Sequence, residues 1–385
     1  MNNPKVDILF VVSEFWQAGT QRFTYEVAST INRQLFNITI LSLRPLGSNE
    51  NWADYYYEKH LSLGDKIVFF EDLVASIKQS KFSRIKNRIS GRSLPVKDKI
   101  LSDFFEKYQA ISILGEYNFP FVAKYLNKIQ KERTIIHIMN SIHQYGEIYS
   151  KFNKQEKFLF CSGFLESEIQ EELKEFSNYE HYYLPLSVSF LETEKWSFTE
   201  QGKKKIGIFT RLTLHKPLDP FFYAFHLLLD KFPEVELHIY GSGDPEESGM
   251  LRYVKQLNLQ EKVIFRGHQT NLIDTALNDK IDLVWFHSYY GQPGGFASFD
   301  ISSVAIPQLF WNFSNTEGSA KDAIFPIFNH LNSLVDRSVE ILSNCGKAEA
   351  LSKAQYEDTL KNRNMKENVV LLESLYQSIV QKELS

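Results

Sequence analysis

Short apolar runs alternate along this chain with longer segments in which apolar residues recur at helical intervals. In the first half, the runs that predict buried strands are residues 6–12, 37–42, 66–70, 110–114, 134–139 and 157–161. A loop at 13–20 and a helix at about 21–33 follow the first strand. Strands that alternate with helices are typical of βαβ units, so we expect a doubly wound domain with a parallel sheet.

The same alternation begins again after the polar stretch 192–205, which is the predicted linker. Later strands are expected at residues 205–209, 234–240, 263–266, 283–286 and 306–311, with helices from about 333 to the end. We predict an α/β protein with two Rossmann-like domains, 1–195 and 203–365, and a terminal helix at 366–385 that crosses back to the first domain. The two sheets are expected to face each other across a cleft, where the carboxyl ends of the strands bind ligands.

Composition narrows the class of protein. A chain of 385 residues fits two domains. Its 43 lysines and arginines against 47 aspartates and glutamates give a net charge of -4, so no basic field favours nucleic acid as a partner. Cys161 and Cys345 lack metal-ligand spacing, which argues against a zinc site and a disulfide framework. The sequence shows neither a signal-peptide core nor an apolar run of about 18 residues, so we expect a cytoplasmic protein.

Two loops that follow predicted strands carry residues suited to binding an anion. Gly19 and Thr20 lie where the first strand leads into its helix, and the N–H groups of a helix start attract anions. The alternative is an ordinary loop in which Thr20 caps the helix. Arg211 and Lys216 follow the first strand of the second domain, where two cations could clamp a diphosphate, unless they are solvated surface charges.

A third loop is rich in glycine and precedes a helix expected to begin near Ala297. Gly294, Gly295 and Phe296 lie at this point, where backbone N–H groups and the helix dipole favour a phosphate. Asp300, about one turn into the helix, has the oxygens to accept hydrogen bonds from a ribose diol. Its alternative role is to complement the helix dipole.

In their order along the chain, these segments resemble the retaining glycosyltransferases of family 4, which have the GT-B fold. Arg211 and Lys216 match the family's cation pair in spacing and position. Residues 234–243 and 263–267 resemble the next two strands of the family, whose ends hold the nucleotide base. Three glycines at those ends become candidate donor-binding residues: Gly241, Gly243 and Gly267.

The family's pair of glutamates is changed in this chain. Asp300 aligns with the second glutamate and Gln292 with the first. Asp300 retains the charge on a shorter side chain, whereas Gln292 retains hydrogen-bonding capacity but lacks the charge that would face the reacting sugar. The resemblance extends from about residue 203 to the C-terminus and is weaker over 6–30 and 134–190.

In the first domain, the family often places a histidine near the transferred sugar. His137, Asn140 and His143 lie at or beyond the end of the strand at 134–139, and each fits that position. We favour His143, which lies farther past the strand, as a catalytic residue. His137 is interpreted as an ordinary residue at a strand end.

Basic residues are concentrated in residues 78–99: Lys78, Lys81, Arg84, Lys86, Arg88, Arg92, Lys97 and Lys99. Among them, Phe82, Ile85 and Ile89 recur at helical spacing. The segment is expected either to contact an anionic membrane surface or to form a solvated helix or loop.

The resemblance implies transfer of a hexosyl group from a nucleotide sugar, with UDP or dTDP favoured, to a saccharide or lipid-linked acceptor. It also implies retention of anomeric configuration, no metal cofactor, and a role in cell-surface polysaccharide synthesis at the inner face of the plasma membrane. One alternative is a non-catalytic GT-B scaffold that binds a glycan or a partner, and another is a sugar-nucleotide epimerase. An oxidoreductase is disfavoured because Gly19 is not followed by the spaced glycines of a dinucleotide fingerprint.

Overall fold

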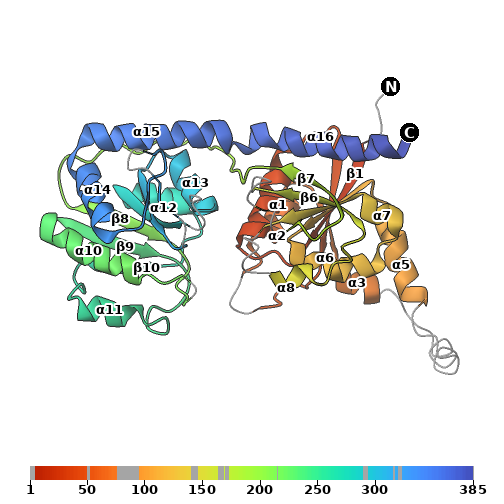
Figure 1. Ribbon diagram of the computed structural model, residues 1–385, viewed down its shortest axis with the longest axis horizontal. Helices are drawn as coiled ribbons and strands as arrows, with labels where there is room; N and C mark the ends of the chain where they lie inside the picture. Colours follow the sequence, from red (N-terminus) through yellow and green to blue (C-terminus); the bar gives the residue numbers. More distant parts are fainter. Residues whose placement is uncertain are drawn as a thin grey trace. The chain divides into compact units, whose positions relative to one another are not determined.

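The structure is a computed structural model that describes residues 5–49, 53–75, 95–139, 146–163, 169, 173–214, 216–288, 294–314, 317–319 and 323–384. The chain forms two compact units, one of Met1–Ser189 with Met365–Ser385 and one of Phe190–Asn364. Each unit contains one parallel sheet with helices packed on it (Figure 1). In the described part of the chain, no helix has the length and apolar character needed to cross a membrane.

The sheet of the first unit has the strand order β3-β2-β1-β4-β5-β6-β7. Its strands are β1 Val6–Val12, β2 Phe36–Ser42, β3 Lys66–Phe69, β4 Ala110–Leu114, β5 Thr134–Ile138, β6 Lys157–Ser162 and β7 Asn178–Tyr183. Its helices are α1 Gly19–Thr30, α2 Tyr55–Ser62, α3 Phe70–Ala75, α5 Pro95–Phe105, α6 Phe119–Val122, α7 Lys128–Glu132, α8 Gly146–Tyr149 and α16 Met365–Leu384, with 3-10 turns η1 Glu116–Asn118 and η2 Ala123–Tyr125. The strand order reverses beside β1, so the carboxyl ends of β1 and β4 flank the point where sheets of this kind bind ligands.

The terminal helix α16 packs against α1 and β4 of the first unit. Its Tyr376 is fully buried, and the Tyr376 hydroxyl lies 2.7 Å from Ser112 Oγ, which lies 3.2 Å from His137 Nε2. Burial lowers the pKa of His137 to about 3, so the imidazole is neutral at physiological pH. This chain of buried polar groups joins the last helix to β4 and β5.

The sheet of the second unit has the strand order β10-β9-β8-β11-β12-β13, and all its pairs are parallel. Its strands are β8 Lys204–Phe209, β9 Val235–Tyr240, β10 Val263–Gly267, β11 Leu283–Ser288, β12 Gln308–Asn312 and β13 Ile327–Phe328. Its helices are α10 Asp219–Lys231, α11 Met250–Gln256, α12 Leu272–Asn278, α13 Phe296–Ser303, α14 Leu331–Ser343 and α15 Cys345–Asn362. The order reverses between β8 and β11, so the loops after these two strands meet at the ligand-binding edge.

Aromatic residues fill the core of the second unit. Phe221 of α10 stacks on Trp285 of β11, with ring centroids 5.9 Å apart, and both side chains are fully buried. The indole Nε1–H of Trp285 donates to Ser338 Oγ of α14 at 3.0 Å, so the one polar atom of this large side chain is satisfied. Helices α10 and α14, which also pack on each other, are thereby fixed against one face of the sheet.

The loops after β8 and β9 pack so closely that glycine is required between them. A Cβ at Gly241 would overlap the Thr210 carbonyl oxygen, and a Cβ at Gly243 would overlap the Leu212 carbonyl oxygen. Backbone hydrogen bonds join the same segments, from Thr210 N to the Tyr240 carbonyl at 2.9 Å and from Leu212 N to the Ser242 carbonyl at 2.8 Å. Gly243 also has φ +113°, a backbone conformation that residues with a side chain avoid. The path of the loop after β8 therefore depends on these glycines.

Replacing Gly241 with Ala is expected to lower the free energy of unfolding by about 2 kcal/mol or more, because the added methyl group must displace backbone rather than a flexible side chain. Urea unfolding of the full chain measures the change. Gly295→Ala is the matched control, since nothing lies within 4 Å of its Cβ position, and it should cost no more than about 1 kcal/mol, the effect of a poorer N-cap residue. Equal effects of the two substitutions would contradict the packing argument.

Candidate active site

The loop after β8 carries the two cations identified in the sequence. Arg211 is exposed, whereas Lys216 is half-buried in a turn closed by its own N–H, which donates to the Thr213 carbonyl at 3.0 Å. Leu212 and Leu218 are buried and anchor the loop at both ends. The structure thus places Arg211 and Lys216 on one short loop at the carboxyl edge of the second sheet.

The charge of Arg211 influences the protonation of Lys216. Burial lowers the pKa of Lys216, and the positive charge of Arg211 lowers it further. Both effects disfavour the charged ammonium group while no anion is present, and a bound anion would reverse the second effect. The loop is therefore electrostatically suited to a negatively charged ligand.

His287, at the end of β11, connects this loop to the next strand. Its Nε2 donates a hydrogen bond to the Pro217 carbonyl at 3.0 Å, and its ring meets Phe221 and Phe313 edge to face at 4.9 and 4.8 Å. Burial, with a smaller contribution from the charge of Lys216, lowers the pKa of His287 to about 4. The imidazole is therefore neutral near pH 7, and it fixes the loop after β8 without adding charge to it.

Sequence analysis did not assign a role to His287. The signal that could have identified it is the polar pair His287-Ser288 at the end of an otherwise apolar strand, since polar residues at the carboxyl ends of parallel strands often face ligands. The hydrogen bond to Pro217 depends on tertiary structure and has no signature in the sequence.

Helix α13 begins beside His287. A Cβ at Gly294 would lie 3.4 Å from the His287 carbonyl oxygen, so the segment before the helix runs close to the end of β11. Gly295 is the N-cap residue and Phe296 the first residue of the helix. Gly295 is exposed and provides no side-chain cap, so the N–H groups of the first turn point toward the same edge as the loop after β8. Gln292 lies outside the described residues.

Asp300 lies in α13 and is only 5% exposed. The helix is held in place by the fully buried Gln308, which accepts from Ser298 Oγ at 2.7 Å and donates to Ser302 Oγ at 2.7 Å. Gln355 in turn donates to the Gln308 carbonyl at 2.9 Å. This network of buried amides and hydroxyls fixes the orientation of α13 and so the position of Asp300 within it.

The three glycines expected at the donor site have different settings. Gly241 and Gly243 shape the loop after β8, as described above. Gly267 ends β10 with φ +69°, and its carbonyl accepts from Gly241 N at 2.9 Å. Gly241, which follows β9, and Gly267, which ends β10, are thus hydrogen-bonded through their backbones. Gly241 also packs against the loop that carries Arg211.

In the first unit, Gly19 is the first residue of α1 and is exposed. The N-cap is Ala18 and not Thr20, which is the second helical residue, so the alternative in which Thr20 caps the helix is wrong. Thr20 and Ser13 instead lie close enough to the hydroxyl of Tyr117, which follows β4, to influence its pKa, which burial raises. The start of α1 therefore lies close to the end of β4 across the reversal of strand order.

A buried carboxyl group lies at the same edge of the first sheet. Glu14 Oε1 accepts from Gln21 Nε2 at 2.8 Å, and Glu14 Oε2 is 3.5 Å from Arg44 Nη1. Burial raises the pKa of Glu14, and Arg44 and Gln21 oppose this shift. Sequence analysis did not single out Glu14, because an isolated acid in a loop has no recognisable pattern.

Of the three candidates for a residue near the transferred sugar, the structure describes His137. His137 is 2% exposed inside the unit, in contact with Ser112 and 5.5 Å from the Phe23 ring. Its buried position agrees with the interpretation of His137 as an ordinary residue of the strand. Asn140 and His143 lie outside the described residues, as do residues 78–94 of the basic segment.

Among the described residues, no cluster of three or more His, Cys, Asp or Glu side chains is arranged to hold a metal ion. The expectation that the reaction needs no metal stays a prediction.

Comparison with known proteins bears on the second unit and on the fold. Residues 191–358 match the family model for glycosyl transferases group 1. No curated protein matches the sequence.

Solved structures are similar over nearly the whole chain. TarM from S. aureus, a mutant of which was crystallised with Fondaparinux, alpha-GlcNAc-glycerol and UDP, has 12% identity and a TM-score of 0.67, over 96% of this chain and 99% of that chain. HepE from Anabaena, in complex with UDP and glucose, has 12% identity and a TM-score of 0.66, over 98% and 99%. Sucrose-phosphate synthase from Thermosynechococcus elongatus has 11% identity and a TM-score of 0.64, over 98% and 100%.

At these identities the structural likeness shows the fold alone, and the fold is GT-B, as predicted. The family match covers most of the unit that contains Arg211, Lys216 and the start of α13. The second unit is thus similar to the glycosyl transferases group 1 over residues 191–358, and this match on a GT-B fold supports a transferase.

Proposed function

We propose that this protein is a retaining glycosyltransferase that moves a hexosyl group from a nucleotide sugar to a saccharide or lipid-linked acceptor. The observation that carries the proposal is the position of Arg211 and Lys216, after β8, and of the start of α13, after β11, at the point where the strand order of the second sheet reverses. Two cations and a helix N-terminus directed at one edge form a site for a diphosphate.

In the proposed reaction, the acceptor hydroxyl forms a bond to the anomeric carbon as the bond from that carbon to the diphosphate oxygen breaks. Negative charge grows on the departing diphosphate, which takes up the proton of the acceptor hydroxyl. Arg211 and Lys216 stabilise that charge, and the N–H groups near Gly294 and Gly295 add hydrogen bonds. Because His287 and Gly241 hold the loop in place beforehand, little reorganisation is needed during the reaction. The protein's own cations balance the leaving group, so the proposed mechanism assigns no step to a metal ion.

Other residues receive roles that follow from their position or from the family resemblance. Asp300 is proposed to bind the ribose, and Gln292 and His143 to face the transferred sugar. Gly19 and Thr20, at the start of α1, are proposed to contribute to donor binding.

For the donor we propose a UDP- or dTDP-sugar, and the UDP named with TarM and HepE supports the first choice. A saccharide or glycolipid acceptor in cell-surface polysaccharide synthesis is proposed for the acceptor side. If the acceptor is lipid-linked, basic residues within 78–99 are proposed to bring the enzyme to an anionic membrane surface.

Arg211→Ala is expected to abolish the rise in melting temperature that UDP or dTDP causes in the wild type, because a ligand that binds only the folded state stabilises it. Turnover should fall by about 100-fold or more, the usual effect of losing one group that stabilises the leaving charge. Arg252→Ala is the matched control, since Arg252 is exposed on α11 and belongs neither to the loop after β8 nor to the start of α13. No rise in melting temperature with any nucleotide, in either protein, would favour the non-catalytic scaffold.

The stereochemistry of transfer is a separate prediction. With an α-linked nucleotide sugar, proton NMR of the product formed with a saccharide acceptor should show an α anomeric signal. A β-linked product would contradict retention. Release of UDP at the same rate with and without acceptor would instead indicate epimerisation or hydrolysis.

A further inference from the structure

A hollow lies at the amino edge of the first sheet, at the starts of β1, β2 and β3 and in the turn before β4. Its volume is about 510 Å³. Twelve residues line it: Lys5, Asp7, Arg33, Phe36, Asn37, Ile38, Thr39, Leu63, Gly64, Lys66, Lys107 and Tyr108. Because parallel strands all run the same way, this edge is the opposite one from the edge that holds Gly19 and the end of β1.

The inner wall of the hollow is buried. Phe36, Thr39 and Tyr108 are all less than 9% exposed. The Asp7 backbone N–H donates to Gln109 Oε1 at 2.6 Å, which joins β1 to the turn before β4. The sheet therefore preorganises the lining residues.

Positive charge surrounds the hollow without being neutralised. Within the described part of the chain, Lys5, Lys66 and Lys107 are exposed and make no ion pair or hydrogen bond through their ammonium groups. Arg33 differs, because its Nη2 lies 2.6 Å from Asp65 Oδ1 of a buried carboxylate.

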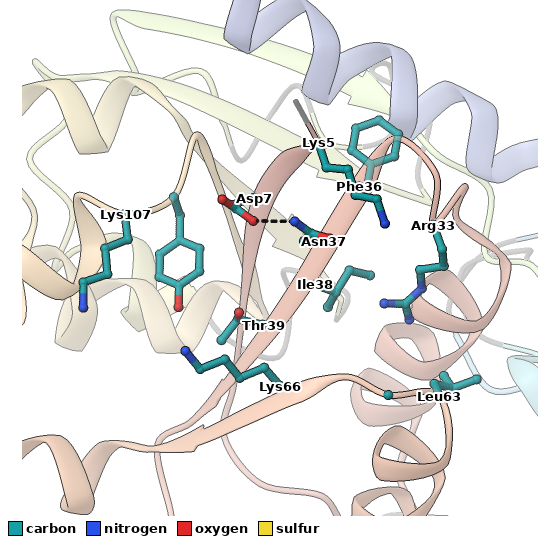
Figure 2. A pocket seen from close by; sticks show the side chains of 12 residues that line it. Lys5, Asp7, Arg33, Phe36, Asn37, Ile38, Thr39, Leu63, Lys66 and Lys107 are labelled. Carbon is teal, nitrogen blue, oxygen red and sulfur yellow. Dashed lines mark hydrogen bonds between the residues drawn. The ribbon is translucent and has the colours of Figure 1, made fainter. Parts of the chain in front are cut away.

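Asp7 is the acid among the lining residues, and its Oδ1 accepts from Asn37 Nδ2 at 2.9 Å. Figure 2 shows this hydrogen bond near the middle of the hollow, with Lys66 and Lys107 on one side and Lys5 and Arg33 on the other. Three unpaired ammonium groups and one carboxylate leave two positive charges in excess.

We propose that this hollow is a second anion site, which binds a ligand through a phosphate group. A phosphomonoester carries about -1.5 to -2 charges at pH 7, which matches the excess of two positive charges, whereas a carboxylate or sulfate ester brings one. The volume is in the range of pockets that hold small molecules, so the ligand extends beyond the phosphate itself. The Asn37 amide and the hydroxyls of Thr39 and Tyr108 supply hydrogen-bonding groups for that remainder.

The phosphate has two possible sources, a soluble phosphorylated compound and the headgroup of an anionic lipid. In both cases the phosphate oxygens would contact the ammonium groups of the same three lysines. The site is independent of the proposed transfer reaction, because none of its residues belongs to the donor loops of the second unit.

The first arm of the test is titration calorimetry of the full-length protein with inorganic pyrophosphate. Lys66→Gln/Lys107→Gln should weaken one binding event by about tenfold or more, since hydrogen bonds to charged groups are lost. Lys124→Gln/Lys128→Gln is the matched control, because it removes the same charge from exposed residues of the first unit outside the hollow. Arg211→Ala should leave this binding event unchanged, which separates it from the proposed donor site.

The second arm is co-sedimentation with phosphatidylcholine vesicles that contain phosphatidic acid. Both double variants retain the basic segment 78–99. A difference in vesicle binding between the two variants therefore reports on the hollow alone. Loss of binding only in Lys66→Gln/Lys107→Gln identifies a lipid headgroup, and loss in the first arm only identifies a soluble phosphate.

If both arms give equal binding for Lys66→Gln/Lys107→Gln and the control pair, the proposal is overturned. All three lysines are exposed, so folding should be preserved, and equal melting temperatures verify this. Lys5→Gln provides a second variant on the other side of the hollow, with the same expected direction.

Discussion

The loop between β8 and α10 is fixed from two sides, and the position of the candidate active site depends on this constraint. On one side, Gly241 lies against the Thr210 carbonyl with no room for a side chain. On the other, the His287 ring donates to the Pro217 carbonyl at the far end of the loop. A loop of this length would otherwise have many conformations, and fixing it costs conformational entropy that the packed glycines and the buried histidine offset.

This constraint matters because the loop brings positive charges together. Burial and the positive charge of Arg211 both disfavour the charged state of Lys216, and a bound diphosphate would oppose both effects. His287 would add a third charge if it were protonated, but its burial keeps it neutral near pH 7. The start of α13 directs N–H groups at the same edge, and the amide network of Gln308 keeps that helix from moving away.

Most of the strands could be predicted from the sequence because buried parallel strands are continuous apolar runs. The strands at 6–12 and 110–114 have the predicted bounds, and others differ by one or two residues. The strand β7, Asn178–Tyr183, was not predicted, because it lies at the edge of the sheet with half-exposed side chains and so lacks an apolar run. The two-residue β13 is too short to leave a pattern.

The candidate site was predictable only in part, because a sequence pattern reveals only features that depend on neighbouring residues. Arg211, Lys216 and the glycines of the α13 segment could be found because chemistry and local backbone geometry determine residue type at those positions. His287, Glu14 and the hollow at the amino edge depend on side chains brought together from distant strands, which no local spacing reveals. Thr20 shows the limit of local rules, since a good capping residue lies two residues past the actual N-cap.

Hydrogen–deuterium exchange in the presence and absence of UDP tests the central claim most directly, that the loops after β8 and β11 form one donor site. Bound UDP should slow exchange at residues 210–218 and at the first turn of α13, since both segments would be ordered by the same diphosphate. Slower exchange at neither segment, or at only one of them while the other is unchanged, would contradict a shared site.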